Sequence, residues 1–238
     1  MFRLSQYLRE LDQPPPDGPV RQPPGPVVIW NLIRRCNLTC KHCYSISSDV
    51  DFSNELSTVE VFSVMDDLKA FRVPVLILSG GEPLMRRDIF DISERAKAMG
   101  FYVGLSSNGT LVDAAMADRI RDIGYDYVGI SLDGIGDTHD RFRRKAGSYQ
   151  QSLNGLRLLR DRGIKVGVRF TMTEDNAAEL LRLLEPRRTG GVSEILSLSP
   201  RLRRARQQEP RRRCGMADHT RRDGFGDQSG LVLGKKRQ

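Results

Sequence analysis

The feature that most constrains the fold of this chain is an alternation of short apolar runs with amphipathic segments, from Val27 to about Leu184. Each apolar run has the length of a buried strand, and each amphipathic segment has the apolar spacing of a helix. Such an alternation predicts right-handed βαβ crossovers and a parallel sheet covered by helices. The five pairs are residues 27–33 with 57–72, 74–79 with 88–100, 101–106 with 113–123, 127–132 with 148–162, and 165–172 with 175–184.

The number of pairs predicts an open barrel rather than a closed one. A closed barrel of eight units needs about 250 residues, whereas five units here occupy about 160. The expected fold class is therefore α/β, a partial (βα) barrel of parallel strands, with its core in residues 27–186. Ligands of such sheets bind at the carboxyl ends of the strands, so we expect the site there.

The segments that flank this core differ from it in composition. Residues 1–26 hold seven of the twelve prolines, which predicts an extended arm. Residues 187–238 carry 14 Lys or Arg against 5 Asp or Glu, and we expect this basic tail to be disordered or non-native. Within it, Val192–Leu198 could form a sixth strand. DNA binding through the tail is a disfavoured alternative, because no aromatic residues interleave its arginines.

Three of the four cysteines lie within eight residues, directly after the first apolar run. Cys36, Cys40 and Cys43 have the spacing C-x3-C-x2-C. Thiolates select iron–sulfur clusters, zinc or copper(I). A zinc site normally uses two separated ligand pairs, and His42 beside Cys43 is poorly placed as a fourth ligand. The spacing favours a four-iron cluster with one open iron, while zinc and incidental buried cysteines remain alternatives.

A glycine-rich turn, Ser79-Gly80-Gly81-Glu82-Pro83, follows the second apolar run. Glycines let backbone approach a ligand closely, and proline stiffens the exit from the turn. The Glu82 carboxylate and exposed carbonyl groups suit an ammonium group. A plain turn is the alternative.

The cysteine spacing, followed by Gly80, Gly81, Glu82 and Pro83 after the second strand, resembles the radical S-adenosylmethionine superfamily. The resemblance implies an enzyme in which the three thiolates hold a [4Fe–4S] cluster and S-adenosylmethionine chelates the fourth iron. It also implies that the reduced cluster cleaves S-adenosylmethionine to a 5′-deoxyadenosyl radical, which abstracts hydrogen from the substrate.

Polar residues at the ends of later strands extend this expected site. The resemblance implies that Ser106, Asn108 and Ser131 contact the ribose or the carboxylate of the cofactor. Asn108-Gly109 and Asp133-Gly134 are also ordinary turn dipeptides. Arg169 lies inside the fifth apolar run, where a charge is unexpected unless it faces the barrel lumen and meets an anion. We expect a carboxylate of the cofactor or substrate there, with a structural ion pair as the alternative.

The segment His139–Lys145 is rich in basic residues. We interpret it as a solvated loop, with the binding of an acidic substrate as the alternative. His139 and Asp140 could also pass a proton.

A narrower resemblance rests on the run Trp30–Cys36, the run Gly104–Thr110 and the N-terminal Phe2-Arg3-Leu4 with its proline arm. These resemble the family of radical enzymes of heme d1 biosynthesis. That family implies a siroheme-derived tetrapyrrole substrate, which loses propionate side chains, and an electron donor such as a flavodoxin or ferredoxin. Subfamilies that make heme or modify peptides and cofactors share the same two motifs.

The tail departs from that family, whose members continue with a sixth strand and the cysteines of an auxiliary cluster. Here only Cys214 remains, and one thiol cannot hold a second cluster. We therefore expect that the sequence after about residue 186 is truncated or out of frame, and an inactive remnant is an alternative to an active enzyme.

The chain has no apolar run near the ~20 residues of a membrane helix and no signal-peptide core at its start. Clustered thiols suit a reducing compartment. We expect a cytoplasmic protein that has no membrane partner.

Overall fold

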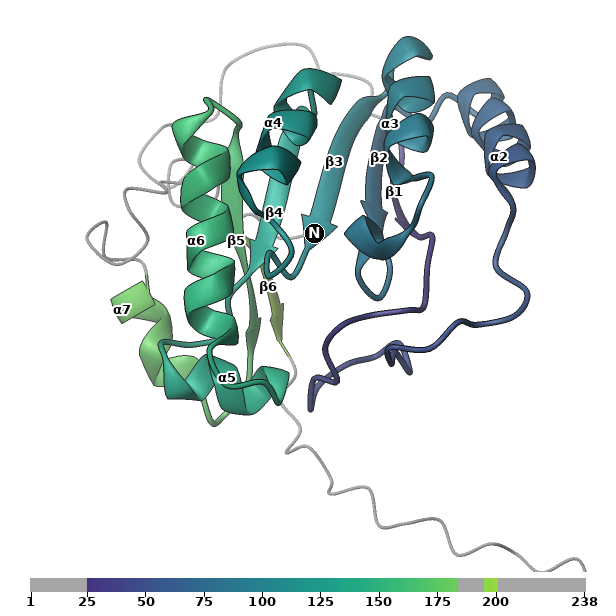
Figure 1. Cartoon of the computed structure of the whole chain (residues 1–238). Coiled ribbons are helices and arrows are strands. Elements are labelled where there is room, and N and C mark those ends of the chain that lie inside the picture. The colour runs from purple at the N-terminus through teal and green to yellow at the C-terminus, as the bar shows by residue number, and fades with distance from the viewer. Residues whose placement is uncertain (1–24, 184–194, 201–238) are drawn as a thin grey trace, which may run out of the picture. The chain divides into compact units, whose positions relative to one another are not determined.

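The computed structural model describes residues 25–183 and 195–200. Six parallel strands form one sheet in the order β1-β2-β3-β4-β5-β6 (Figure 1), within a unit that spans Met1–Ala205. This order confirms the predicted open, partial barrel, because each strand lies beside the strand that precedes it in the chain. The strands are β1 Val27–Asn31, β2 Val75–Ser79, β3 Tyr102–Ser107, β4 Tyr127–Ser131, β5 Val166–Met172 and β6 Ile195–Pro200.

The helices pack their apolar stripes against the sheet. They are α2 Thr58–Ala70, α3 Ile89–Ala98, α4 Ala114–Ile123 and α6 Ser148–Asp161, and Figure 1 shows α3, α4 and α6 over the same face of the sheet. Each contributes fully buried side chains to the core, such as Met65, Ile92, Ile120 and Leu156. Because all strands of the sheet are parallel, their carboxyl ends lie together at one edge of the sheet.

Two helices begin with a side-chain cap. Ser57 and Glu60 form a capping box at α2, in which the Glu60 carboxylate accepts the Ser57 N–H at 2.8 Å. The Asp113 side chain accepts the Met116 N–H at 2.7 Å and caps α4. Asp88 precedes α3 but does not cap it, because its carboxylate instead accepts the Thr58 hydroxyl at 2.6 Å.

The interpretation of His139–Lys145 as a solvated loop is wrong. Residues Asp137–Arg143 form helix α5, which buries Thr138, His139, Phe142 and Arg143. The buried side of this helix is largely polar, so the sequence shows no apolar stripe that would predict a helix here. The fifth unit ends in the short helices η2 Ala177–Glu179 and α7 Leu180–Leu183.

Strand β6 overlaps the sixth strand that we considered at Val192–Leu198. It lies inside the range 187–238 that we expected to be disordered or non-native. It runs parallel to β5, with Val168 opposite Ile195. The proline arm and the arginine-rich segment lie outside the described residues, so the expectations for them stay predictions. Among the described residues, no helix has the length and apolar character needed to cross a membrane.

Candidate active site

A cavity of about 480 Å³ lies where the carboxyl ends of the strands meet the cysteine segment. Its walls come from the ends of β2, β3, β4 and β5 and from the loop that follows β1. The cavity brings together all of the predicted site residues except Glu82 and Pro83: Cys36, Cys40, Cys43, Gly80, Gly81, Ser106, Asn108, Ser131 and Arg169. Residues that span 134 positions of the sequence, from Cys36 to Arg169, thus line one cavity.

The three thiols differ in their surroundings. Cys36 is buried, Cys40 is half-buried and Cys43 is exposed, and all three are free. Burial raises the pKa of the Cys36 thiol to about 11. Burial also raises the pKa of Cys40, although the nearby Arg143 charge opposes the shift. A metal that binds these groups must displace their protons, so binding releases protons to solvent.

The arrangement of the thiols bears on which metal group fits. Among the described residues, no three Cys, His, Asp or Glu side chains converge closely enough to hold a single metal ion. A mononuclear zinc site needs ligands about 2.0–2.3 Å from one point, whereas a four-iron cluster takes one thiolate on each iron. Three thiols that line a roomy cavity without converging fit the cluster better than they fit zinc.

The turn after β2 packs directly on the backbone that leads to Cys36. The Gly81 N–H donates to the Ile33 carbonyl at 2.6 Å, and the Glu82 N–H donates to the Arg35 carbonyl at 2.9 Å. A Cβ on Gly81 would fall against the carbonyl oxygens of Arg34 and Arg35, closer than Cβ atoms approach other backbone. Glycine is required here because two backbone segments touch, and the contact fixes the start of the cysteine segment.

The Glu82 side chain turns into the protein instead of lining the cavity. It is fully buried, and its carboxylate accepts the Ser107 hydroxyl at 2.9 Å, the Asn108 N–H at 2.8 Å and the Leu84 N–H at 3.1 Å. Burial raises its pKa to about 7, although these three hydrogen bonds favour the charged form. Pro83 begins the short helix η1 Pro83–Met85. Glu82 therefore joins the glycine turn to the end of β3.

The Arg169 side chain reaches from β5 to the end of β3. It lines the cavity, donates a hydrogen bond to Ser106 Oγ, and lies opposite Ser131 in the β4–β5 register. Burial lowers the pKa of its guanidinium. In the described ranges no carboxylate forms an ion pair with it, so the structural ion pair that we considered is not seen there. A half-buried cation on a cavity wall is stabilised by an anion that enters the cavity.

Asn108 connects β3 to the cysteine segment. Its Nδ2 donates to Asn37 Oδ1 at 2.9 Å and lies 3.9 Å from the Cys36 sulfur. Thr110 in turn donates to Asn108 Oδ1 through both its N–H, at 2.9 Å, and its hydroxyl, at 2.7 Å. The side chain is held on three sides, which is more order than a plain turn requires.

Two residues near the cavity escaped the sequence analysis as site residues. Asp133 is fully buried at the end of β4, where it pairs with Arg143 at 2.5 Å and with His42 at 3.1 Å. Burial alone would raise its pKa, but the Arg143 charge and the hydrogen bond from His42 hold the pKa well below its usual range. The signal for Asp133 was its place directly after a buried strand. Arg143 had no local signal.

His139 and Asp140 face different partners, so the geometry does not support the proton pair that we considered. His139 is buried, its Nδ1 accepts the Asp133 N–H at 3.1 Å, and burial lowers its pKa to about 4. The Asp140 carboxylate accepts the N–H groups of Gly147 at 2.6 Å and Tyr149 at 2.7 Å, at the start of α6. Both residues hold backbone in place.

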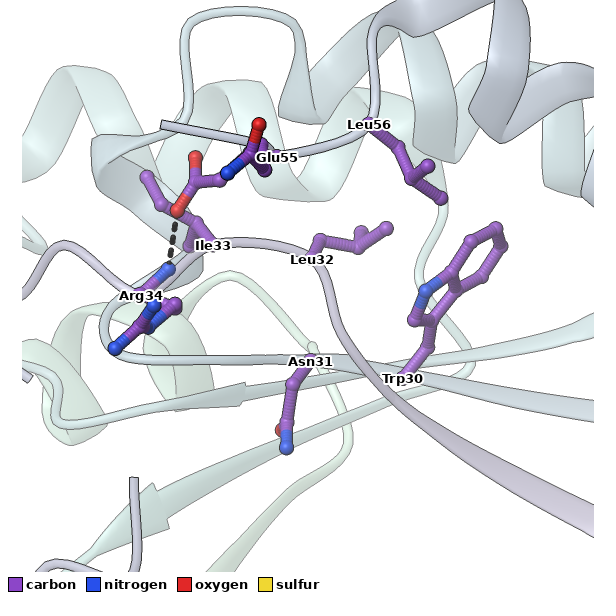
Figure 2. Close-up of a pocket in the computed structure, with 8 residues that line it drawn as sticks. Trp30, Asn31, Leu32, Ile33, Arg34, Glu55 and Leu56 are labelled. Carbon is purple, nitrogen blue, oxygen red and sulfur yellow. Dashed lines mark hydrogen bonds between the residues drawn. The ribbon is translucent and has the colours of Figure 1, made fainter. Parts of the chain in front are cut away.

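A second, smaller cavity of about 150 Å³ lies beside the end of β1 and shares no lining residue with the first. Figure 2 shows the Glu55 carboxylate directed at the Arg34 backbone, whose N–H it accepts at 2.6 Å. Trp30, Leu32 and Leu56 line the rest of it. This contact is a second anchor for the segment just before Cys36, in addition to the glycine turn.

A partial parallel barrel with three cysteines, a glycine turn and an arginine around one cavity defines a class of cofactor-binding α/β enzymes. The family model of the radical SAM superfamily matches residues 30–185, and the chain belongs to this superfamily. Its members use a [4Fe–4S] cluster together with S-adenosylmethionine. The prediction of a radical S-adenosylmethionine enzyme with these two cofactors is confirmed at this level.

Comparison with curated relatives shows which members of the superfamily this chain resembles. The chain is 55% identical over 185 residues to the pre-heme d1 synthase of Dinoroseobacter shibae, which covers 78% of this chain and 46% of the relative. It is 46% identical over 155 residues to the Fe-coproporphyrin III synthase of Methanosarcina barkeri, which covers 65% of this chain and 39% of the relative. The chain thus spans less than half the length of these two relatives.

Solved structures support the fold. SuiB of Streptococcus suis, bound to S-adenosylmethionine, aligns with a TM-score of 0.57 at 14% identity, over 66% of this chain and 36% of that one. Coproporphyrinogen III oxidase of Escherichia coli aligns with a TM-score of 0.52 at 13% identity, over 73% and 48%. At these identities the likeness concerns the barrel and not the substrate.

Proposed function

We propose that Cys36, Cys40 and Cys43 hold the [4Fe–4S] cluster and that the 480 Å³ cavity accepts S-adenosylmethionine beside it. When bound, the reduced cluster supplies one electron that cleaves S-adenosylmethionine into methionine and a 5′-deoxyadenosyl radical. The observation that carries the proposal is that three thiols and Arg169, which has no carboxylate partner among the described residues, line a single cavity.

The remaining residues bind and orient. Arg169 pairs with the carboxylate of S-adenosylmethionine, since its half-buried guanidinium lines the cavity and has no carboxylate partner among the described residues. Ser106, which accepts a hydrogen bond from Arg169, and Ser131, opposite Arg169 in the strand register, present hydroxyls to the ribose or to the same carboxylate. Asn108 keeps the end of β3 against the cysteine segment.

The glycine turn contributes backbone rather than side chain. Gly80 and Gly81 bring carbonyl groups to the cavity wall, where they suit the ammonium group of S-adenosylmethionine. Glu82 and Pro83 do not line the cavity and support the turn from behind. The Glu82 carboxylate binds the end of β3, and Pro83 begins η1. The role of Glu82 is thus to hold the turn that meets the cofactor.

For the substrate we propose a siroheme-derived tetrapyrrole that loses propionate side chains, as in heme d1 biosynthesis. The support is that the two relatives described above are named for tetrapyrrole synthesis. The electron comes from a low-potential donor such as a flavodoxin or ferredoxin. We place the reaction in the cytoplasm, where thiols stay reduced.

Product analysis tests the cofactor reaction separately from the substrate. Anaerobically reconstituted protein, reduced with dithionite and given S-adenosylmethionine, is expected to release 5′-deoxyadenosine and methionine. Release no faster than from Cys40→Ala would overturn the cofactor assignment. Mass spectrometry of an added siroheme-derived tetrapyrrole then tests the substrate, and unchanged tetrapyrrole alongside 5′-deoxyadenosine release would reject that part alone.

A further inference from the structure

The C-terminal turn of α5 docks on the loop between the second and third cysteines. The Lys41 N–H donates to the Phe142 carbonyl at 2.8 Å. The His42 ring meets the Phe142 ring edge to face, with centroids 5.5 Å apart. Both contacts join residues about 100 positions apart, and together they hold the loop that carries Cys40 and Cys43 against a helix end.

Arg143, the last residue of α5, lies between a carboxylate and a cysteine sulfur. One amino group of its guanidinium is 2.5 Å from Asp133 Oδ2, and the other donates to the Cys40 sulfur at 3.5 Å. The residue is 8% exposed and Asp133 is fully buried. A buried guanidinium is costly unless it is paired. These contacts give each amino group of Arg143 a partner, whereas its buried Nε has no hydrogen-bond partner among the described residues.

Asp133 is itself held by groups other than Arg143. Its Oδ1 accepts the Thr171 N–H at 2.8 Å, and its Oδ2 lies 3.1 Å from His42 Nε2. Asn176 donates to the Asp133 carbonyl at 2.9 Å. The carboxylate therefore stands at a fixed point at the end of β4, and it aims the guanidinium of Arg143 at Cys40.

The three cysteine sulfurs are not equivalent in this respect. Cys36 has the neutral Asn108 amide at 3.9 Å, and the Cys43 thiol donates to the Ser45 carbonyl at 2.6 Å. Within the part of the chain that the structure describes, Cys40 alone has a cationic hydrogen-bond donor. The buried charge is thus directed at one sulfur of the set.

We propose that Arg143 is a positioning residue of the cluster site, which orients Cys40 and raises the reduction potential of the bound cluster, with Asp133 holding its guanidinium in place. The inference rests on the proposed function. Hydrogen bonds to the cysteine sulfurs and nearby positive charge stabilise the reduced, more negative state of an iron–sulfur cluster. Removal of the cation therefore makes the cluster harder to reduce.

The test is the midpoint potential of the cluster in the reconstituted full chain, followed by electron paramagnetic resonance without S-adenosylmethionine. In Arg143→Gln the equilibrium constant for reduction is expected to fall about tenfold, equivalent to about 59 mV for one electron. Arg143→Lys keeps the charge but loses the fork, so its potential lies between the two. The matched control is Arg144→Gln, which removes the exposed charge of the adjacent residue and is expected to keep the wild-type midpoint potential.

Each outcome bears on the inference. If the clusters of Arg143→Gln and Arg143→Lys have the wild-type midpoint potential, the inference is overturned and the proposed function is unaffected. If wild-type protein binds no cluster, the proposed function and the inference fall together. Loss of the cluster from both variants, with circular dichroism and melting temperature unchanged, supports the positioning role. Loss of the fold in both overturns it, because Arg143 is then a structural residue only.

Discussion

The buried carboxylate of Glu82 accepts the backbone N–H of Asn108 at 2.8 Å and so joins the turn after β2 to the end of β3. Burial raises the pKa of this carboxyl from its ordinary value of 4.5 to about 7. Between these values the folded state binds more protons than the unfolded state, so stability falls as the pH rises. The loss across this window is about 3 kcal/mol.

Unfolding by urea between pH 4.5 and 8 measures this effect. The lowered pKa of His139 acts in the opposite direction in this pH range, and it acts equally in wild type and in Glu82→Gln. We therefore expect the free energy of unfolding of wild-type apoprotein to fall by about 3 kcal/mol relative to that of Glu82→Gln, which cannot titrate, as the pH rises through the window. Wild type and Glu82→Gln with parallel pH profiles would show that Glu82 stays charged throughout.

Gly81 lies where the glycine turn touches the backbone before Cys36. In Gly81→Ala the added Cβ meets the carbonyl oxygens of Arg34 and Arg35, neither of which can move away like a side chain. We expect a loss of about 2 kcal/mol or more and a reduced iron content after reconstitution. The matched control is Gly163→Ala, where φ is 76° and nothing lies near the new Cβ, with a cost of about 1 kcal/mol. Equal losses in the two variants would contradict a special contact at Gly81.

Asp140 is expected to act on stability and not on proton transfer. Its carboxylate accepts two backbone N–H groups and the Ser148 hydroxyl, at 2.9 Å, at the start of α6. Asp140→Ala should lower the free energy of unfolding by about 1–2 kcal/mol. The exposed Asp137→Ala serves as the control. Asp140→Ala protein that is as stable as wild type but releases no 5′-deoxyadenosine would restore the proton-transfer hypothesis.

Arg169 is expected to determine the affinity for S-adenosylmethionine. A hydrogen bond between charged groups contributes about 1.5–3 kcal/mol, so Arg169→Gln should weaken binding about tenfold or more. Equilibrium dialysis on cluster-loaded protein gives the dissociation constant. Arg121→Gln, on the exposed side of α4, should bind like wild type. An unchanged affinity in Arg169→Gln would assign Arg169 to the substrate or to the fold.

Local sequence carries most of the fold, because strands and helices of this class have their own apolar periods. Several elements lie where those periods and the residues typical of helix ends place them. Examples are strand β1 at Val27–Asn31, the start of α2 at Ser57 with Glu60, and α4 between Asp113 and Gly124. Helix α5 was missed because it buries His139 and Arg143, so its buried side has no apolar period.

The candidate site was predictable as a set of positions but not as a set of contacts. The cysteines, Gly80, Gly81 and Arg169 could be named because each breaks a local pattern at or within a strand. Two of the three partners of Glu82 lie 25 and 26 residues away, and Arg143 lies 103 residues from Cys40. Contacts of this kind depend on how the strands are stacked, which no local pattern records.

The most direct test of the account is the iron and sulfide content of anaerobically reconstituted protein in four single variants. Wild type and Cys214→Ala are expected to hold about four irons and four sulfides per chain, with the absorbance of a [4Fe–4S] cluster. Cys36→Ala, Cys40→Ala and Cys43→Ala should each lose it. A full cluster retained by any of these three, or wild-type protein that takes up zinc and no iron–sulfur cluster, would contradict the assignment.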